Sequence, residues 1–207
     1  MKADSKTAGR RLVTCAVILT AGEGSRLGSV PKALIEIAGE TLVARLITTL
    51  QKVGIKDLIA VTGHYSLPIM HELLNLPITV TEHPDNIHTQ QDSLRLGLKA
   101  LKRGFNSVMV VPVDMPCLTE TDLSELIDVY ENASSNIAFV GPVVHGLPGN
   151  PVIFNEHIAE GILHGDLNVG NGKWRQQQSN WLLEWHTGND HYLIDIDTPG
   201  DLAQWSC

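Results

Sequence analysis

Hydrophobic and polar positions alternate in blocks along this chain, and the blocks predict strands and helices in turn. Continuous apolar runs rich in β-branched residues predict strands at 15–20, 57–63, 77–82 and 107–114. Between them, apolar residues at helical spacing predict helices at 42–53, 67–74, 92–101 and 122–130. The strands lack an alternation of inside and outside positions, which is typical of a parallel sheet covered on both faces. The pattern therefore predicts a three-layer α/β fold with a mostly parallel sheet.

The pattern changes after residue 136. Two short apolar runs, 136–143 and 150–154, are separated by a Gly/Pro-rich connection, and a helix is expected over 156–163. The run "YLIDID" predicts a strand with Asp195 and Asp197 on one face. It precedes a last helical turn that Asp197 or Thr198 would cap. Since no repeat or linker interrupts the chain, we expect a flexible tail over 1–13 and a single domain over 14–207.

Composition and charge exclude several classes of function. The chain has 207 residues, 43% of them hydrophobic, and a net charge of −8. The acidic balance argues against a nucleic-acid surface, and no apolar run approaches the roughly 20 residues that cross a bilayer. The three cysteines are widely spaced and odd in number, which favours a reducing cytoplasm over a disulfide framework. The nine histidines form no HExxH or Cys/His set, so the sequence does not support zinc catalysis.

A glycine-rich loop follows the first predicted strand. Its sequence, "TAGEGSRLG" at 20–28, fits neither the dinucleotide fingerprint nor the P-loop. Glycines nevertheless let the backbone approach an anion, and Arg26 and Lys32 supply positive charge nearby. We expect this loop to bind phosphates. The alternative is an ordinary strand-to-helix turn with solvated charges.

Two acidic segments predict a metal site. Asp114 ends a buried apolar run, where an ionised carboxylate is costly unless it is paired or bound to metal. Because Thr119 and Asp122 are better placed to cap the next helix, a ligand role for Asp114 is favoured over an Asx turn. Asp195 is preferred over Asp197 as the second ligand, because Asp197 has a capping role. Two such carboxylates beside a phosphate site would suit Mg²⁺.

Two further features stay open at this stage. The stretch "HGLPGNPVIF" at 145–154 is a pinned turn that could present backbone amides to a second substrate, but turn chemistry explains it equally well. Four tryptophans late in the chain are expected to be core or lid residues: Trp174, Trp181, Trp185 and Trp205.

The order of these motifs resembles a known family. "LTAGEGSRLGSVPKAL" is similar to the LxAGxSxRMGxxK loop of nucleotidyltransferases, and "PVDMPCL" to their DMP segment. "GLPGNPVIF" and "LIDIDTPGDL" resemble the GxPGHPV and DIDTPEDL segments, and "IAVTGH" and "TEHPDN" occur in the expected order. Across 14–204 the chain resembles the molybdenum cofactor cytidylyltransferase branch of the molybdopterin nucleotidyltransferases.

The resemblance implies a Rossmann-like fold and a Mg²⁺-dependent transfer of CMP from CTP to molybdopterin cofactor, with release of pyrophosphate. It also implies a recipient molybdoenzyme as a further partner. Ala21 stands where relatives that transfer GMP have glycine, which points to CTP. Arg26, Lys32 and Asp114 would be catalytic, and Asp114 and Asp195 would hold the metal. The implied nucleotide-binding residues are Thr20, Ala21, Gly22, Glu23, Gly24, Ser25, Thr62, Gly63, His64 and Ser93. The implied acceptor-binding residues are Gly149, Asn150 and Arg175.

Departures from the family pattern fall on the acceptor side. Thr89 stands at a glycine position of the family, Asn150 replaces a histidine, and "GDLNVGNGKWR" expands a GDxGAR segment in which Arg175 is the matching arginine. Two alternatives therefore stay open. The acceptor could be a sugar phosphate, a polyol phosphate or another small phosphate, or the protein could be a non-catalytic cofactor carrier or insertion factor.

Overall fold

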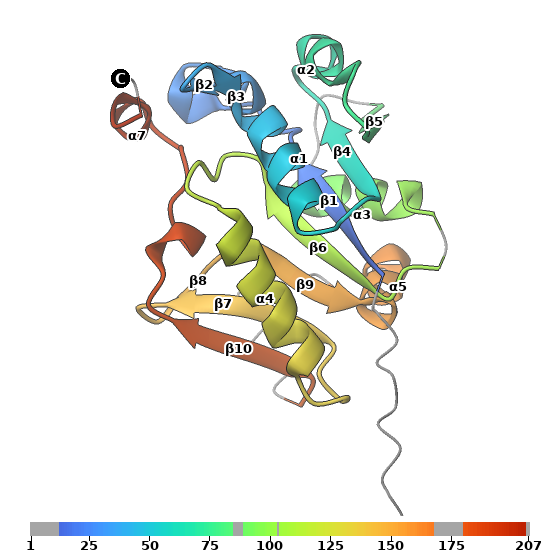
Figure 1. Cartoon of the computed structure of the whole chain (residues 1–207). Helices are drawn as coiled ribbons and strands as arrows, with labels where there is room; N and C mark the ends of the chain where they lie inside the picture. Colours follow the sequence, from blue (N-terminus) through green and yellow to red (C-terminus); the bar gives the residue numbers. More distant parts are fainter. Residues whose placement is uncertain (1–12, 85–88, 103, 168–179, 206–207) are drawn as a thin grey trace, which may run out of the picture.

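The computed structural model describes residues 13–84, 89–102, 104–167 and 180–205 (Figure 1). Its main feature is an eight-stranded sheet with the order β10-β7-β9-β6-β1-β4-β5, in which β8 pairs with β7. The strands are β1 (Thr14–Leu19), β4 (Leu58–Thr62), β5 (Thr79–Glu82), β6 (Ser107–Pro112), β7 (Phe139–Val144), β8 (Leu147–Pro148), β9 (Val152–Asn155) and β10 (Leu182–Thr187). β9 runs antiparallel to β6 and β7, so the sheet is mixed but mostly parallel.

Helices cover both faces of this sheet, which confirms the predicted three-layer α/β class. One core packs α1 (Leu42–Lys52), α2 (Ser66–Leu73) and α4 (Glu120–Asn132) against one face. A second core packs α3 (Gln90–Ala100) and α5 (Glu156–His164) against the other. Successive residues of β1 alternate between the cores: Ala16 and Ile18 face the first, and Cys15 and Val17 the second. This two-sided burial is why the strand is apolar throughout.

Smaller elements complete the fold. They are the 3₁₀ turns η1 (Ser25–Leu27), η2 (Lys32–Leu34) and η3 (Asp190–Tyr192), the short hairpin β2 (Glu36–Ile37) and β3 (Glu40–Thr41), and the terminal helix α7 (Pro199–Ala203). The hairpin and the first 3₁₀ turns lie between β1 and α1, so the chain makes a long excursion at the carboxyl end of β1 before the first helix begins.

The strand order places a ligand crevice beside β1. This strand is parallel to β4 on one side and to β6 on the other. The chain therefore extends the sheet from β1 to β4 and β5, and then returns to the opposite side of β1 with β6. In open α/β sheets, ligands bind outside the carboxyl ends of the strands at such a reversal. The loops that follow β1 and β6 are the ones that carry Arg26, Lys32 and Asp114.

Most predicted elements are present within a few residues of their predicted bounds, but some elements of the region after 136 and of the first loop were not predicted, and one predicted strand is absent. The strand β10 was missed because Glu184 and His186 interrupt its apolar pattern at an exposed sheet edge. The β2–β3 hairpin was missed as well. The segment predicted as a strand over 192–197 instead continues from η3 as irregular chain, tied to the rest of the molecule by the hydrogen bond from Ile196 N to the Asp114 carbonyl (2.9 Å).

The remaining predictions concern the N-terminal tail, the cysteines and the tryptophans. The predicted tail lies outside the described residues except for Val13, and so do Trp174 and Cys207. Cys15 and Cys117 are free thiols. Within the described ranges, none of the helices has both the length and the apolar character needed to span a membrane. Trp181, Trp185 and Trp205 each pack against one of the hydrophobic cores, as expected for core residues.

Candidate active site

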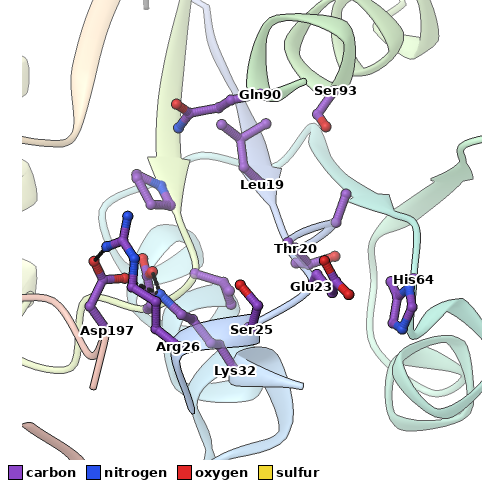
Figure 2. Close-up of a pocket in the computed structure, with 16 residues that line it drawn as sticks. Leu19, Thr20, Glu23, Ser25, Arg26, Lys32, His64, Gln90, Ser93 and Asp197 are labelled. Atoms are coloured by element: carbon purple, nitrogen blue, oxygen red, sulfur yellow. Dashed lines mark hydrogen bonds and ion pairs between the residues drawn. The ribbon is translucent and has the colours of Figure 1, made fainter. Parts of the chain in front are cut away.

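A pocket of about 580 Å³ opens at the carboxyl end of β1 (Figure 2). Its walls come from the glycine-rich loop, the chain after β6, the start of α3 and the segment before α7. The lining residues are Leu19, Thr20, Ala21, Gly22, Glu23, Gly24, Ser25, Arg26, Lys32, His64, Gln90, Ser93, Pro112, Val113, Asp114 and Asp197. Most of the residues predicted for nucleotide binding and catalysis therefore meet in one cavity.

Backbone geometry explains the glycines of the loop. Thr20 is anchored to β4, because its hydroxyl donates to the Val61 carbonyl at 2.8 Å. Gly24 then adopts a left-handed conformation (φ 62°), and its carbonyl accepts from Leu27 N and Ser29 N. A Cβ at this position would collide with the carbonyl oxygen of Val30. Only glycine therefore allows the tight turn that brings Ser25 and Arg26 to the pocket wall.

Charged groups from three distant segments meet at one end of the pocket. Lys32 Nζ lies 2.7 Å from Asp114 Oδ2 and 2.5 Å from Asp197 Oδ1, and Arg26 Nη1 lies 2.6 Å from Asp197 Oδ2. The side chains of Lys32 and Asp114 are each 17% exposed, whereas that of Arg26 is 75% exposed. Lys32 is thus a fixed member of the cluster, and Arg26 lies at its open edge.

The electrostatics of this cluster favour ionised groups. Burial alone would lower the pKa of Lys32, but the charges and hydrogen bonds of Asp114 and Asp197 outweigh it and raise that pKa. The hydrogen bond from Lys32 is the main reason why the pKa of Asp197 lies below its usual value. Lys32 and Asp197 thus stabilise each other in their charged forms.

The structure corrects the reason for preferring Asp195 over Asp197. Thr198, and not Asp197, caps α7, in a capping box with Asp201. Asp197 is thereby left to turn its carboxylate toward Lys32 and Arg26, and it lines the pocket, which Asp195 does not. Partial burial and the charges of Asp114 and Asp197 raise the pKa of Asp195, so it lies near the cluster. Asp195 stays a prediction as a metal ligand, and Asp197 is the stronger candidate.

The donor set fits Mg²⁺ that is shared with phosphates. Among the described residues, no group of three or more His, Cys, Asp and Glu side chains could hold a metal ion by itself. Mg²⁺, however, usually takes one or two protein carboxylates together with phosphate oxygens and waters. Asp114 and Asp197 both lie within hydrogen-bond distance of the same ammonium, so a cation can be held between them.

Further polar groups line the other end of the pocket. In Figure 2, Ser93 and His64 lie across the pocket from Arg26 and Asp197. Ser93 Oγ is 3.0 Å from His83 Nε2. Gln90 also lines the pocket, in the first turn of α3. Thr89 caps this helix in a capping box with Asp92, which gives a structural role to the threonine found in place of glycine.

Besides Asp195, four predicted residues do not line the pocket: Thr62, Gly63, Gly149 and Asn150. Thr62 is fully buried, and the carbonyl of Gly63 accepts from Ser66 N at the start of α2. Two amides of the 145–151 turn are used internally: Gly149 N donates to the Pro142 carbonyl and Asn150 N to the Tyr192 carbonyl, both at 2.9 Å. These two amides are not available to a substrate. Gly149 and Asn150 stay predictions as acceptor-binding residues.

Sequence reasoning also missed some lining residues, and Arg175 cannot be placed. Arg175 lies outside the described residues. Gln90 was signalled by the T-x-x-D capping box at 89–92, which marks the residue after Thr89 as the first of a helix. Leu19, Pro112 and Val113 carry no polar signal and line the pocket only because they end β1 and β6.

Comparisons with known proteins identify the family of the chain. The family model described as "MobA-like NTP transferase domain" matches residues 16–181. The bifunctional protein GlmU of Mycobacterium marinum is 32% identical over 132 residues, which is 60% of this chain and 27% of that protein. GlmU of Francisella tularensis subsp. holarctica is 28% identical over 198 residues, 88% of this chain and 43% of that protein. The chain thus spans less than half the length of these relatives.

Solved structures are similar over nearly the whole chain. Rv0371c of Mycobacterium tuberculosis matches with a TM-score of 0.76 at 19% identity, covering 93% of this chain and 97% of that one. A second structure of that protein is described as a complex with manganese. A 4-diphosphocytidyl-2C-methyl-D-erythritol synthase from Anaerococcus prevotii matches with a TM-score of 0.71 at 17% identity, covering 93% and 94%. At these identities the likeness shows the fold.

Proposed function

This chain belongs to the MobA-like NTP transferase domain family, and from that premise we propose that it transfers a nucleoside monophosphate from a nucleoside triphosphate to a phosphate group on a small acceptor. Pyrophosphate leaves, and Mg²⁺ is required. One observation carries this proposal: the Lys32 ammonium lies between Asp114 and Asp197 beside a glycine-rich loop, in a pocket at the switch point of the sheet.

The residues of the pocket have distinct roles in this reaction. The backbone of the loop over 22–26 approaches the triphosphate, and Lys32 and Arg26 neutralise the charge of its oxygens. Asp114 and Asp197 would hold the Mg²⁺, which when bound supplies further charge neutralisation at the phosphates. Nucleotidyl transfer needs in-line placement and stabilisation of charge more than it needs a protein acid or base. The absence of a histidine from the charged end of the described pocket is consistent with this chemistry.

CTP is the proposed nucleotide. Ala21 occupies the position at which GMP-transferring relatives are expected to have glycine, and it lines the pocket. Ser93 and His64, at the end away from the charged cluster, are placed where the base would lie if the triphosphate follows the glycine-rich loop. The choice among bases rests mainly on Ala21 and is tested directly below.

A sugar or polyol phosphate is the favoured acceptor. A pterin acceptor would need the 86–93 and 145–151 loops to form one deep polar pocket; residues 86–88 lie outside the described residues. Gln90 and Ser93 line the pocket, but Gly149 and Asn150 do not, and their amides bond within the protein. The names of the relatives reported above do not refer to molybdopterin, and one structural neighbour is named for a cytidyl derivative of methylerythritol. Transfer of CMP to molybdopterin is therefore the second candidate.

The test is release of pyrophosphate from each of the four NTPs with Mg²⁺. Each NTP is paired with a panel of acceptors: sugar 1-phosphates, methylerythritol phosphate, other polyol phosphates and molybdopterin. We expect release with CTP and one of the sugar or polyol phosphates. Release with molybdopterin alone would restore the second candidate, and release with GTP alone would reverse the choice of base. No release with any pair, together with binding of molybdopterin without turnover, would favour a carrier or insertion factor.

A further inference from the structure

The segment that carries Asp195 and Asp197 has to cross the sheet without the support of a strand. β10 ends at Thr187 at one edge of the sheet, and Asp114 follows β6, three strands away. At about 4.8 Å per strand this crossing is about 14 Å. Figure 1 shows the chain passing from β10 by the start of α4 toward α7. Its residues from 193 to 198 belong to no helix or strand, so other contacts must fix their position.

A group of side chains at the start of α4 provides such contacts. The carboxylate of Asp122, a residue only 3% exposed, accepts from Asn189 Nδ2 at 2.6 Å and from His191 Nδ1 at 2.9 Å. The hydroxyl of Tyr192, which is fully buried, donates to the main-chain carbonyl of Asp122 at 2.7 Å. Asp122 also accepts from the amide and hydroxyl of Thr119. Asn189, His191 and Tyr192, with Asp122 as their shared anchor, are called the Asp122 clamp below.

The clamp is one of two attachments between the same two segments. The first joins residues 189–192 to residue 122, and the second is the hydrogen bond from Ile196 N to the Asp114 carbonyl at 2.9 Å. Asp114 and Asp122 lie eight positions apart in the loop and helix that follow β6, and Ile196 is fully buried. Two attachment points fix both the position and the direction of the segment between them. One attachment alone would leave it free to pivot.

The turn at 145–151 supports the same segment from the other side. The Tyr192 carbonyl accepts from Asn150 N at 2.9 Å, and a Cβ at Gly149 would lie 2.6 Å from that carbonyl oxygen. The ring of Trp185 packs edge-on against Tyr192, with ring centroids 5.4 Å apart. The glycine in "GLPGN" therefore allows close approach to Tyr192, which explains the motif without a substrate contact.

We propose that the Asp122 clamp is a set of positioning residues for the Mg²⁺ site: it holds residues 189–197 so that the Asp197 carboxylate faces Asp114 across the pocket. This inference rests on the proposed function, because it concerns the metal of that reaction. None of the clamp residues lines the pocket. They act through the placement of Asp197, and a displacement of that carboxylate by about 1 Å would weaken a metal site that needs near-octahedral geometry.

The test measures metal binding separately from nucleotide binding. Mn²⁺ serves as the probe, titrated by the electron paramagnetic resonance signal of the free ion in the presence of a non-hydrolysable α,β-methylene NTP. The variants are Tyr192→Phe, Asn189→Ala and His191→Ala. We expect the Kd for Mn²⁺ to rise about tenfold in each, while the affinity for the analogue in EDTA changes less than twofold. A general loosening of the fold would weaken both.

Matched variants separate positioning from stability. Tyr130→Phe also removes the hydroxyl of a partly buried tyrosine, and His186→Ala removes a histidine from the exposed face of β10. Both should bind Mn²⁺ like the wild type. His191→Asn keeps an N–H donor near the place of Nδ1 and should recover most of the affinity that His191→Ala loses.

Three results would overturn the inference. Mn²⁺ affinity could be unchanged in all three clamp variants while the wild type binds the ion. His191→Asn could be as weak as His191→Ala, in which case the hydrogen bond to Asp122 is not the cause. If the wild type itself binds neither the analogue in EDTA nor Mn²⁺ with the analogue present, the proposed function fails and the inference fails with it.

Discussion

The Asp197 carboxylate competes with a triphosphate for the cations of the pocket. Its removal is therefore expected to have two opposite effects on nucleotide binding. In the structure it accepts from both Lys32 and Arg26. A triphosphate arriving without metal must displace the carboxylate from these groups. A triphosphate arriving with Mg²⁺ instead offers Asp197 a new cation. We therefore expect Asp197→Asn to bind NTP more tightly in EDTA and to bind and use Mg²⁺-NTP less well.

The size of the first effect follows from exposure. The Arg26 pair joins side chains that are 75% and 35% exposed, so it contributes well under about 1 kcal/mol. The Lys32 pair is 17% and 35% exposed. A charge-assisted hydrogen bond contributes about 1.5–3 kcal/mol when well shielded, and screening by solvent at the Asp197 side reduces this toward about 1–1.5 kcal/mol. Together the pairs oppose metal-free binding by about 1.5 kcal/mol, or roughly tenfold in Kd.

The assay is isothermal titration of the NTP that the pyrophosphate assay identifies, first in EDTA and then with Mg²⁺, followed by turnover. Asp128→Asn is the control, because it removes the same charge from an exposed position of α4 outside the pocket. In EDTA the control should match the wild type, while Asp197→Asn gains about tenfold in affinity. With Mg²⁺, Asp197→Asn should lose on the order of tenfold or more in metal affinity. Weaker binding in EDTA would refute the reasoning, since Asp197 would then not compete with phosphate.

Three further predictions concern other parts of the molecule. Lys32→Ala should raise the KM for NTP, and an unchanged KM in steady-state kinetics would contradict a phosphate contact. Gly97→Ala should lower the unfolding free energy by about 1–3 kcal/mol, because the new Cβ would lie 2.9 Å from Val61 Cγ2. Calorimetry measures this loss. The control is Gly188→Ala, where a Cβ meets open space, and its unfolding free energy should be near that of the wild type. Burial would raise the pKa of Asp122, but hydrogen bonds led by that from His191 lower it. Its contribution to stability is therefore present above the unfolded-state pKa of about 3.9 and is lost as the pH falls through the lower folded-state pKa. Urea unfolding at several pH values should show that the difference in unfolding free energy between wild type and Asp122→Asn shrinks in acid. A difference that grows in acid would contradict this expectation.

The first half of the fold was predictable because its signals are local. A strand buried on both faces must be apolar throughout, as β1 is, and a helix on the sheet must repeat its apolar residues every three or four positions, as α1 does. The edge strand β10 broke the first rule because part of it is exposed, with Glu184 and His186 in its middle. Its pairing with β7 depends on a partner more than 40 residues away.

The candidate site divides in the same way. By itself the sequence determined the glycine-rich loop, the charges of Arg26 and Lys32, and Asp114 after a buried strand, because glycine conformations and strand ends are encoded by neighbouring residues. The tertiary structure alone decided that Asp197 and not Asp195 turns toward Lys32, 165 positions away, and that the amides of Gly149 and Asn150 bond within the protein. A carboxylate or an amide takes the partner that the fold brings within about 3 Å, and nothing in the residues beside it along the chain specifies which group that will be.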